Sequence, residues 1–542
     1  MKLSCLFLIL LVLIVPVSYT PQSASRPPTT GPTIRPWSEP HLNHAYLHKA
    51  WETAGRDWIH SYSGVKWVER SRKWEIDQGW PYRETDVGPR AYYIEYTTQM
   101  GIHMGQTCKD IRLLNELAEF YKVYANRFTT LGAMRRRKSK SLDTDWLKNQ
   151  GDDSARTLVW IQESEKGKRQ IGENALYNTQ FFHPAAKLIR VITQLPESER
   201  TPAMRDFVRL YAPLIVREHL LRFIYQAEWT DETYGDLVPR QLFSIWTTIL
   251  STTARPALSW QHGMFDWDLW LIATSAEMLG ANANSPALVP LTQDDKSRLQ
   301  RAVQVGVSLF QQKRTLYPDT KNFRGEVVGS ASYFNGVYDD HPDMAYSGYA
   351  TEAFPPKDQK RPRQGASWDI SHFYRVPIFL RSLYDNRRAT GVDFPSVRDI
   401  ELVTNQFMYK MFRGDFQRPL FNNFFDGSNG WYLVTYEDTP KGHPPAQYCD
   451  SRTEDRWCLG QVGGAWGLLA SFNLDVVQLY YALANLAAKQ DAQAQRFRDQ
   501  YYFYNQKSFA FLDSDGQTQY PILLFWTLSG LPEKLHGCAK QD

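Results

Sequence analysis

The chain has 542 residues, of which 43% are hydrophobic and 22% are charged, so it can bury a sizeable core. The formal net charge is only +4. So small a net charge on a chain of this size produces a weak electrostatic field, which argues against nucleic acid as the main partner.

Aromatic residues are abundant, at 14% of the chain. Flat rings stack on the faces of sugars, and this excess therefore favours a carbohydrate ligand. Large helical cores also use aromatic residues heavily, so the structural alternative stays open.

The N-terminus has the pattern of a secretory signal over residues 1–20. Lys2 precedes an apolar run at residues 6–15, which is too short for a membrane span. Residues 21–40 form a Pro/Ser/Thr-rich segment. We expect residues 41–542 to form a single domain that is secreted or periplasmic, with no stable membrane span after signal removal.

Four cysteines follow the signal. Cys449 and Cys458 flank a short polar loop, and in an oxidising compartment this spacing favours a local disulfide. Cys108 and Cys538 offer a second pairing. The spacing between Cys449 and Cys458 does not match a zinc motif.

Helical periodicity dominates the rest of the chain. The segments expected to be helical are 41–61, 92–128 with a break near Gly101 to Gly105, 175–192, 201–227, 237–249, 265–279 ending at Gly280, 294–312, 369–388, 396–412, 463–488, 492–504 and 520–528. Strand signals are sparse, and the best are at 325–328 and 432–436.

The order of these helices is informative. Segments 265–279 and 463–488 are apolar on most faces, whereas 294–312 and 492–504 each have one apolar stripe. Buried helices that alternate with half-exposed ones predict a mainly α fold, in which helical hairpins close into a ring. This pattern resembles the (α/α) toroid, or barrel, of secreted glycosidases and polysaccharide lyases. The resemblance implies long loops, a few short β-hairpins and a site at the mouth of the ring.

The densest group of reactive side chains lies at residues 339–388. Asp340 and His341 stand in an acidic, Pro-containing stretch that suits general acid–base chemistry, or alternatively a simple turn. Trp368, Asp369 and His372 lie at the expected N-terminus of an apolar helix that starts near Asp369 to Ser371, where Asp369, His372 and Val376 would share one face. Tyr374 and Arg375 follow directly. The alternative for this second group is a helix cap beside core residues.

Three other places carry candidate residues. Asp266 begins an apolar helix and is either a cap or an acid catalyst. The remaining candidates are polar or aromatic side chains suited to binding sugar hydroxyls or rings. They are Trp260, His262, Tyr177, Asn178, Asn423, Trp431 and Glu437.

These residues favour a glycoside hydrolase in which Asp340 and Asp369 are the acid and the base, with Asp266 in reserve. His372 and Arg375 would orient or neutralise groups of the substrate. The tryptophans at 260, 368 and 431 would stack on sugar rings.

Two alternatives remain. The first is a lyase acting on a uronic acid polymer, with His372 or Tyr374 as the base and Arg375 as the carboxylate clamp. The second is a non-catalytic protein that binds or exports polysaccharide. No cofactor or metal is expected: the HExxH motif is absent, and His41, His44 and His48 have no carboxylate in register. The oligomeric state is left open.

Overall fold

The computed structural model describes most of the chain between His44 and Cys538. The described residues are 44–79, 87–136, 142–143, 152–158, 160–163, 169–172, 175–229, 240–251, 263–333, 367–370, 372–430, 464–488, 511–512, 518–519, 521–532 and 538. This part is mostly helical, with a few short strand pairs, as the sequence predicts.

The helices of the first half of the chain are α1 (His44–Ala50), α2 (Arg56–Ser63), α3 (Val87–Thr107), α4 (Ile111–Tyr124), α5 (Leu131–Arg136), α6 (Ala175–Gln194), α7 (Pro202–Pro213), α8 (Arg222–Tyr225) and α9 (Leu242–Ser251). Those of the second half are α10 (Asp266–Asn284), α11 (Gln293–Gln312), α12 (Arg375–Asp385), α13 (Arg387–Thr390), α14 (Val397–Gln406), α15 (Asp475–Ala488) and α17 (Pro521–Leu528). Shorter 3₁₀ and π turns extend several of them, notably the π turns η1 (Trp51–Gly55), η6 (Leu214–Leu221) and η10 (Phe407–Met411) and the 3₁₀ helix η12 (Gly464–Phe472).

The strands form small separate pairs. Antiparallel pairs join β1 (Val65–Val68) to β2 (Lys73–Ile76), β3 (Thr129–Thr130) to β5 (Arg156–Thr157), β8 (Glu228–Trp229) to β9 (Arg240–Gln241), β10 (Arg314–Tyr317) to β11 (Ser330–Tyr333) and β12 (Phe511–Leu512) to β13 (Thr518–Gln519). In the one three-stranded sheet of the described part, β7 (Arg169–Gly172) pairs with β6 (Trp160–Glu163) and, in parallel, with β4 (Leu142–Asp143).

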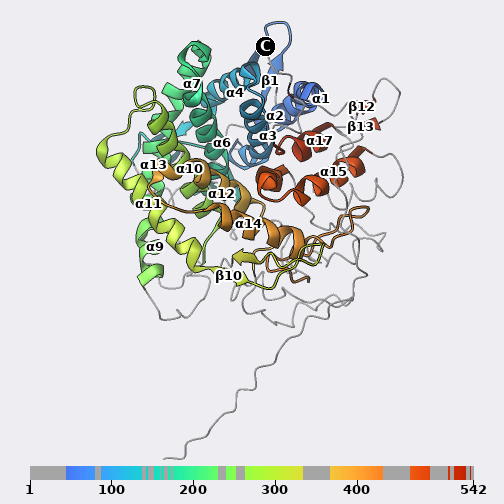
Figure 1. The fold of residues 1–542 in the computed structure, drawn as a ribbon. Coiled ribbons are helices and arrows are strands. Elements are labelled where there is room, and N and C mark those ends of the chain that lie inside the picture. The colour runs from blue at the N-terminus through green and yellow to red at the C-terminus, as the bar shows by residue number, and fades with distance from the viewer. Residues whose placement is uncertain are drawn as a thin grey trace, which may run out of the picture.

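Six elements pack against one another in succession. Helix α3 packs on α6, α6 on α10, α10 on α12, α12 on η12, η12 on α17, and α17 on α3. A second set covers them: α4 and α7 pack on α3 and α6, α11 packs on α10, and α14 and α15 pack on η12. In Figure 1, α3, α6, α10 and α12 lie in the middle of the helical body, and α4, α7 and α11 lie along its outside.

The buried side chains match this arrangement. Helix α10 is buried continuously from Asp268 to Ala281, whereas α11 buries one face only, including Leu299, Val303 and Phe310. The apolar pattern of the two segments thus predicts their positions correctly.

Helices α6, α10 and α12 run in the same direction. Contacts near their N-terminal ends join Gln180 to Tyr374 and Arg375 to Asp266. Further along the same helices, Asn386 just beyond the end of α12 contacts Glu277 of α10. The N-terminal ends of these three buried helices therefore lie together.

Two expectations about helix ends are wrong. Helix α3 runs unbroken through Gly101 and Gly105, and α10 runs through Gly280. A Cβ at these positions would press on Trp51, Leu114 and Asn386 respectively, so the glycines allow close packing and do not end the helices.

The segment at 463–488 is also not one helix. The 3₁₀ helix η12 and helix α15 meet at Asn473, whose side chain accepts a hydrogen bond from the Asp475 amide at 2.9 Å. Such a local bond competes with helical hydrogen bonding and separates the two elements.

Helix α12 begins at Arg375 and not near Asp369. Asp369 forms an isolated β-bridge with Phe424, and the Ile370 amide donates to the Asn423 carbonyl at 2.8 Å. These bonds hold the backbone outside the helix, in a turn that carries His372.

Cys108 and Cys538 form a disulfide, with their Cα atoms 5.5 Å apart. Cys449 and Cys458 lie outside the described residues. In the described part of the chain, none of the helices combines the length and the apolar character needed to cross a bilayer.

Candidate functional site

The N-terminal ends of α10 and α12 bring together two charged residues that are far apart in sequence. Asp266 is the first residue of α10, and Arg375 is the first residue of α12. Arg375 Nη1 lies 2.8 Å from Asp266 Oδ2, and both side chains are nearly buried. The exposed amides of the first helical turn also favour a negative charge at Asp266.

His372 lies between two carboxylates. Its Nδ1 is 2.7 Å from Asp369 Oδ2, and its Nε2 is 3.8 Å from Asp266 Oδ2. Asp369 is fully buried, whereas 26% of the His372 side chain is exposed to solvent. The buried carboxylate therefore orients the ring, and the other side of the ring faces Asp266 at the surface of the cluster.

The charges around His372 set its protonation. Burial alone would lower the pKa of His372, but the carboxylates of Asp369 and Asp266 outweigh burial, and its pKa is raised above the ordinary value. Arg375 opposes this rise. An imidazole with a partly exposed edge and a tuned pKa is well suited to transfer protons.

Tyr374 and Arg375 pack against each other. The guanidinium of Arg375 lies over the Tyr374 ring, with 4.6 Å between its Cζ and the ring centroid. Gln180 of α6 donates a hydrogen bond from Nε2 to the Tyr374 hydroxyl at 3.2 Å. We call Asp266, Asp369, His372, Tyr374 and Arg375 the His372 cluster.

A buried acid lies near this cluster. Glu95 of α3 is only 2% exposed. Burial raises its pKa to about 8, although the positive charges of Arg375 and Lys187 act against the rise. Its Oε1 atom has no hydrogen-bond partner among the described residues.

The other predicted binding residues that the structure describes are Trp368, Asn423, Asn178 and Tyr177. Trp368 is 1% exposed and belongs to the core. Asn423 donates to the Gly430 carbonyl at 2.7 Å, and Asn178 donates to the Leu158 carbonyl at 3.2 Å, so both amides hold neighbouring backbone. Tyr177 is half-buried on α6. Their roles in binding a sugar stay predictions.

Six predicted site residues lie outside the described part of the chain, and their roles also stay predictions. They are Asp340, His341, Trp260, His262, Trp431 and Glu437.

The sequence interpretation missed Gln180 and Glu95. Glu95 carries a recognisable signal, because a single carboxylate in the otherwise uncharged stretch from Ala91 to Met104 is expensive to bury without a purpose or a partner. Gln180 gives no such signal, since only the packing of α6 against α12 brings it to Tyr374.

Among the described residues, one group of side chains that could bind a metal ion is found, and none of its members belongs to the His372 cluster. One ring nitrogen of His44 and the sulfur atoms of Cys108 and Cys538 all lie within 4.8 Å of one another.

Comparison with known proteins finds no matching family model, no matching curated protein and no matching solved structure.

Proposed function

We propose that the protein is an exported, carbohydrate-active enzyme of the (α/α) toroid type, and that it breaks a glycosidic bond at the His372 cluster. The toroid is supported by the succession of packed elements α3, α6, α10, α12, η12 and α17, in which the last contacts the first. The shared direction of α6, α10 and α12 supports a site at their N-terminal ends. The apolar N-terminal run and the Cys108–Cys538 disulfide support export.

The geometry of the cluster bears on the type of reaction. Paired-carboxylate hydrolysis needs two acids about 5–5.5 Å apart, or about 6.5–9.5 Å apart with a water between them. Here Asp369 is fully buried against His372, and the imidazole lies between Asp369 and Asp266. The two aspartates thus act on the imidazole, and a pair of acids on either side of a substrate bond is not formed by Asp266 and Asp369.

Elimination does not require such a pair of acids on either side of the bond. In a polymer of uronic acids, a base removes the proton from C5, the electron pair forms the C4–C5 double bond, and the oxygen on C4 leaves with a proton. His372 Nε2 can take the C5 proton and return it to the leaving oxygen on the same side. Asp369 would orient the ring, and Arg375 would supply positive charge near the substrate carboxylate.

We therefore place a polysaccharide lyase first and a glycoside hydrolase second. The observation that carries the lyase is the 2.7 Å Asp369–His372 contact, which fixes the orientation of a partly exposed imidazole beside Asp266 and Arg375. The observation that favours hydrolysis is the raised pKa of His372, because a ring that keeps its proton can donate it to a leaving oxygen.

One screen separates the two. The purified full chain is incubated with neutral and acidic polysaccharides, and two products are measured: ultraviolet absorbance from a new C4–C5 double bond, and reducing ends. The lyase predicts both signals on a uronate polymer, and hydrolysis predicts reducing ends alone. Both signals should be lost in His372→Gln and kept in Arg209→Gln, a change at an exposed residue of α7. Turnover that survives in His372→Gln would contradict the proposal, as would tight binding of a polymer without turnover.

A further inference from the structure

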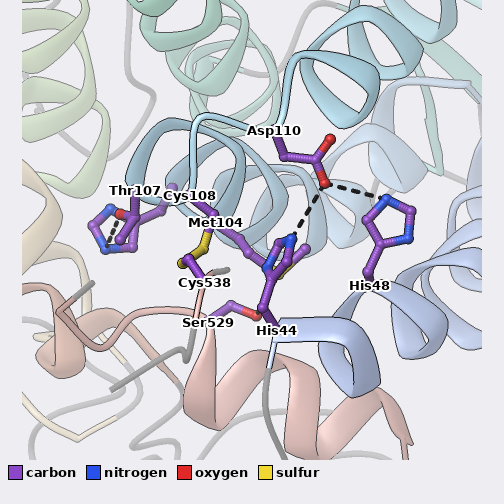
Figure 2. The surroundings of a disulfide bond; sticks show 9 residues. His44, His48, Met104, Thr107, Cys108, Asp110, Ser529 and Cys538 are labelled. Atoms are coloured by element: carbon purple, nitrogen blue, oxygen red, sulfur yellow. Dashed lines mark hydrogen bonds and ion pairs between the residues drawn. A yellow bond between two sulfur atoms is a disulfide. The ribbon is translucent and has the colours of Figure 1, made fainter. Parts of the chain in front are cut away.

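A second cluster lies where the start of α1, the end of α3 and the start of α4 meet the C-terminal Cys538. Figure 2 shows the ring of His44 between the Cys108–Cys538 disulfide and the carboxylate of Asp110. The potential ligand atoms of His44, Cys108 and Cys538 lie within 4.8 Å of one another. Cys108 is more than sixty positions from His44 and more than four hundred positions from Cys538 in the sequence.

The two nitrogens of His44 have different surroundings. Nε2 lies 3.5 Å from Asp110 Oδ2, whereas Nδ1 is buried and has no hydrogen-bond partner among the described residues. A buried ring nitrogen without a partner loses its hydration and gains nothing in return. It is available as a ligand for an ion on the side of the two sulfur atoms.

Asp110 is held in place independently of His44. Its Oδ1 accepts a hydrogen bond from the Leu113 amide at 2.9 Å, as the N-cap of α4, and His48 Nε2 lies 3.2 Å from its Oδ2. A histidine that ligates a metal with one nitrogen commonly donates its other N–H to a carboxylate, which fixes the ring and its tautomer. Asp110 supplies that carboxylate here.

We propose that His44, Cys108 and Cys538 form a site for a thiophilic divalent cation of the zinc class when the two cysteines are reduced. Two thiolates and an imidazole are ligands that zinc prefers, and water completes the tetrahedron. In such a site the ligand atoms lie roughly 3.5–3.8 Å apart. The present cluster therefore needs a small contraction around His44 and a separation of the two sulfur atoms.

The cation and the disulfide exclude each other. A dithiol reductant delivers two electrons and two protons to the Cys108–Cys538 bond and becomes a disulfide itself, leaving two thiols in the protein. Binding of the cation then displaces both thiol protons. Either state joins Cys108, just after α3, to Cys538, and the cation would in addition join His44 of α1 to both cysteines.

Cobalt(II) provides a direct probe, because thiolate ligands give it a charge-transfer absorbance in the near ultraviolet. The other thiols are first removed by Cys5→Ser, Cys449→Ser and Cys458→Ser in the full chain. The protein is reduced with a dithiol, freed of reductant without oxygen, and titrated with Co²⁺. We expect one ion per chain, displacement by Zn²⁺, and no thiolate band in the oxidised protein.

Two variants test the ligand set. His44→Gln should weaken Co²⁺ binding by at least ~10–100-fold, the loss that even indirect contacts produce at such sites. Cys538→Ser removes one thiolate without altering α1 or α4 and should reduce the charge-transfer intensity as well. His48→Gln is the matched control, because His48 contacts Asp110 but is not a ligand. Circular dichroism verifies that each variant is folded. Unchanged affinity in His44→Gln, or the absence of a thiolate band in the reduced parent, would overturn the proposal.

Discussion

Helices α10 and α12 carry residues of two charged clusters, which differ in access to solvent. The His372 cluster lies at the start of α10 and α12. Further along α6, α10 and α12, a second group is centred on Arg190, which forms an ion pair with Glu277 and lies 3.4 Å from Asp385 Oδ2. We call His183, Lys187, Arg190, Glu277, Asp385 and Asn386 the Arg190 cluster.

Both clusters join an arginine to a carboxylate and include a histidine, but the His372 side chain is 26% exposed, whereas His183 is fully buried. Arg190 and Glu277 are each 1% exposed, and Asn386 donates to Glu277 at 3.1 Å. In the Arg190 cluster, burial and the nearby charges of Lys187 and Arg190 hold the pKa of His183 well below its ordinary value. The Arg190 cluster therefore suits a structural role and the His372 cluster suits proton transfer, because the two histidines differ in solvent exposure and in the charges around them.

The largest expected effect is on activity at the His372 cluster. His372→Gln should lower the turnover of a carbohydrate substrate by about 10²–10⁴-fold, because a positioned acid–base group contributes that much to a rate. The free energy of unfolding should change far less. Initial rates at equal concentrations of folded protein, with Arg209→Gln as the control, measure the effect. A loss of less than tenfold would remove His372 from the reaction.

The Arg190 cluster should show the opposite behaviour, with a large effect on stability. Arg190→Met leaves Glu277 buried without its main counter-charge, which typically costs about 3–5 kcal/mol of unfolding free energy. Urea denaturation measures this cost. Arg209→Met is the matched control, since its pair with Asp206 is exposed, and a change of no more than ~1 kcal/mol is expected there. Equal effects of the two variants would contradict a closed, buried network.

A smaller effect is expected where the backbone of α10 approaches the same network. In Gly280→Ala, the added Cβ would overlap the Asn386 amide oxygen and press on Arg190. Overpacking of this kind costs about 1–3 kcal/mol. Thermal unfolding at a fixed pH would detect it, and an unchanged melting temperature would show that Asn386 can move aside freely.

A further effect should appear as a pH dependence of stability. The pKa of Glu95 is about 8 in the folded protein and near 4.5 when exposed, so the folded state holds the proton more tightly. The stabilisation from this group is fully present below pH 4.5 and is lost as the pH rises through about 8. As the pH rises from about 4.5 to about 8, the unfolding free energy of the wild type should fall relative to that of Glu95→Gln, and urea denaturation at several pH values measures the difference. Parallel curves would contradict the buried, protonated carboxyl.

The sequence predicted the helices better than their ends. Apolar stripes placed α10 and α11 correctly, since those patterns arise from burial of one face or of all faces. The glycines at 101, 105 and 280 were taken for helix breaks, but each lies against a side chain from a distant segment. Close packing between helices leaves no mark in the local sequence that distinguishes it from a break.

The candidate site was predictable only where its parts are close in sequence. Asp369 and His372 are three residues apart, and a turn brings them into contact, although the helix expected to hold them begins only at Arg375. The approach of Asp266 to Arg375 depends on the packing of α10 against α12, across more than one hundred residues. The contact of His44 with Asp110 likewise depends on the packing of two separate helices. His44 begins α1, whereas Asp110 is the N-cap of α4, so the sequence around His44 does not reveal this partner.

The comparison of the two clusters depends on the proton at His372, and one NMR titration tests it directly. The full chain is labelled with ¹³C at the histidine Cε1 position, and the signals of His372 and His183 are assigned from His372→Gln and His183→Gln. We predict that His372 titrates above its ordinary value of 6.5, whereas His183 remains neutral at and below that pH while the fold persists. A His372 signal that titrates below 6.5, or a His183 signal that titrates like an exposed histidine, would contradict the account.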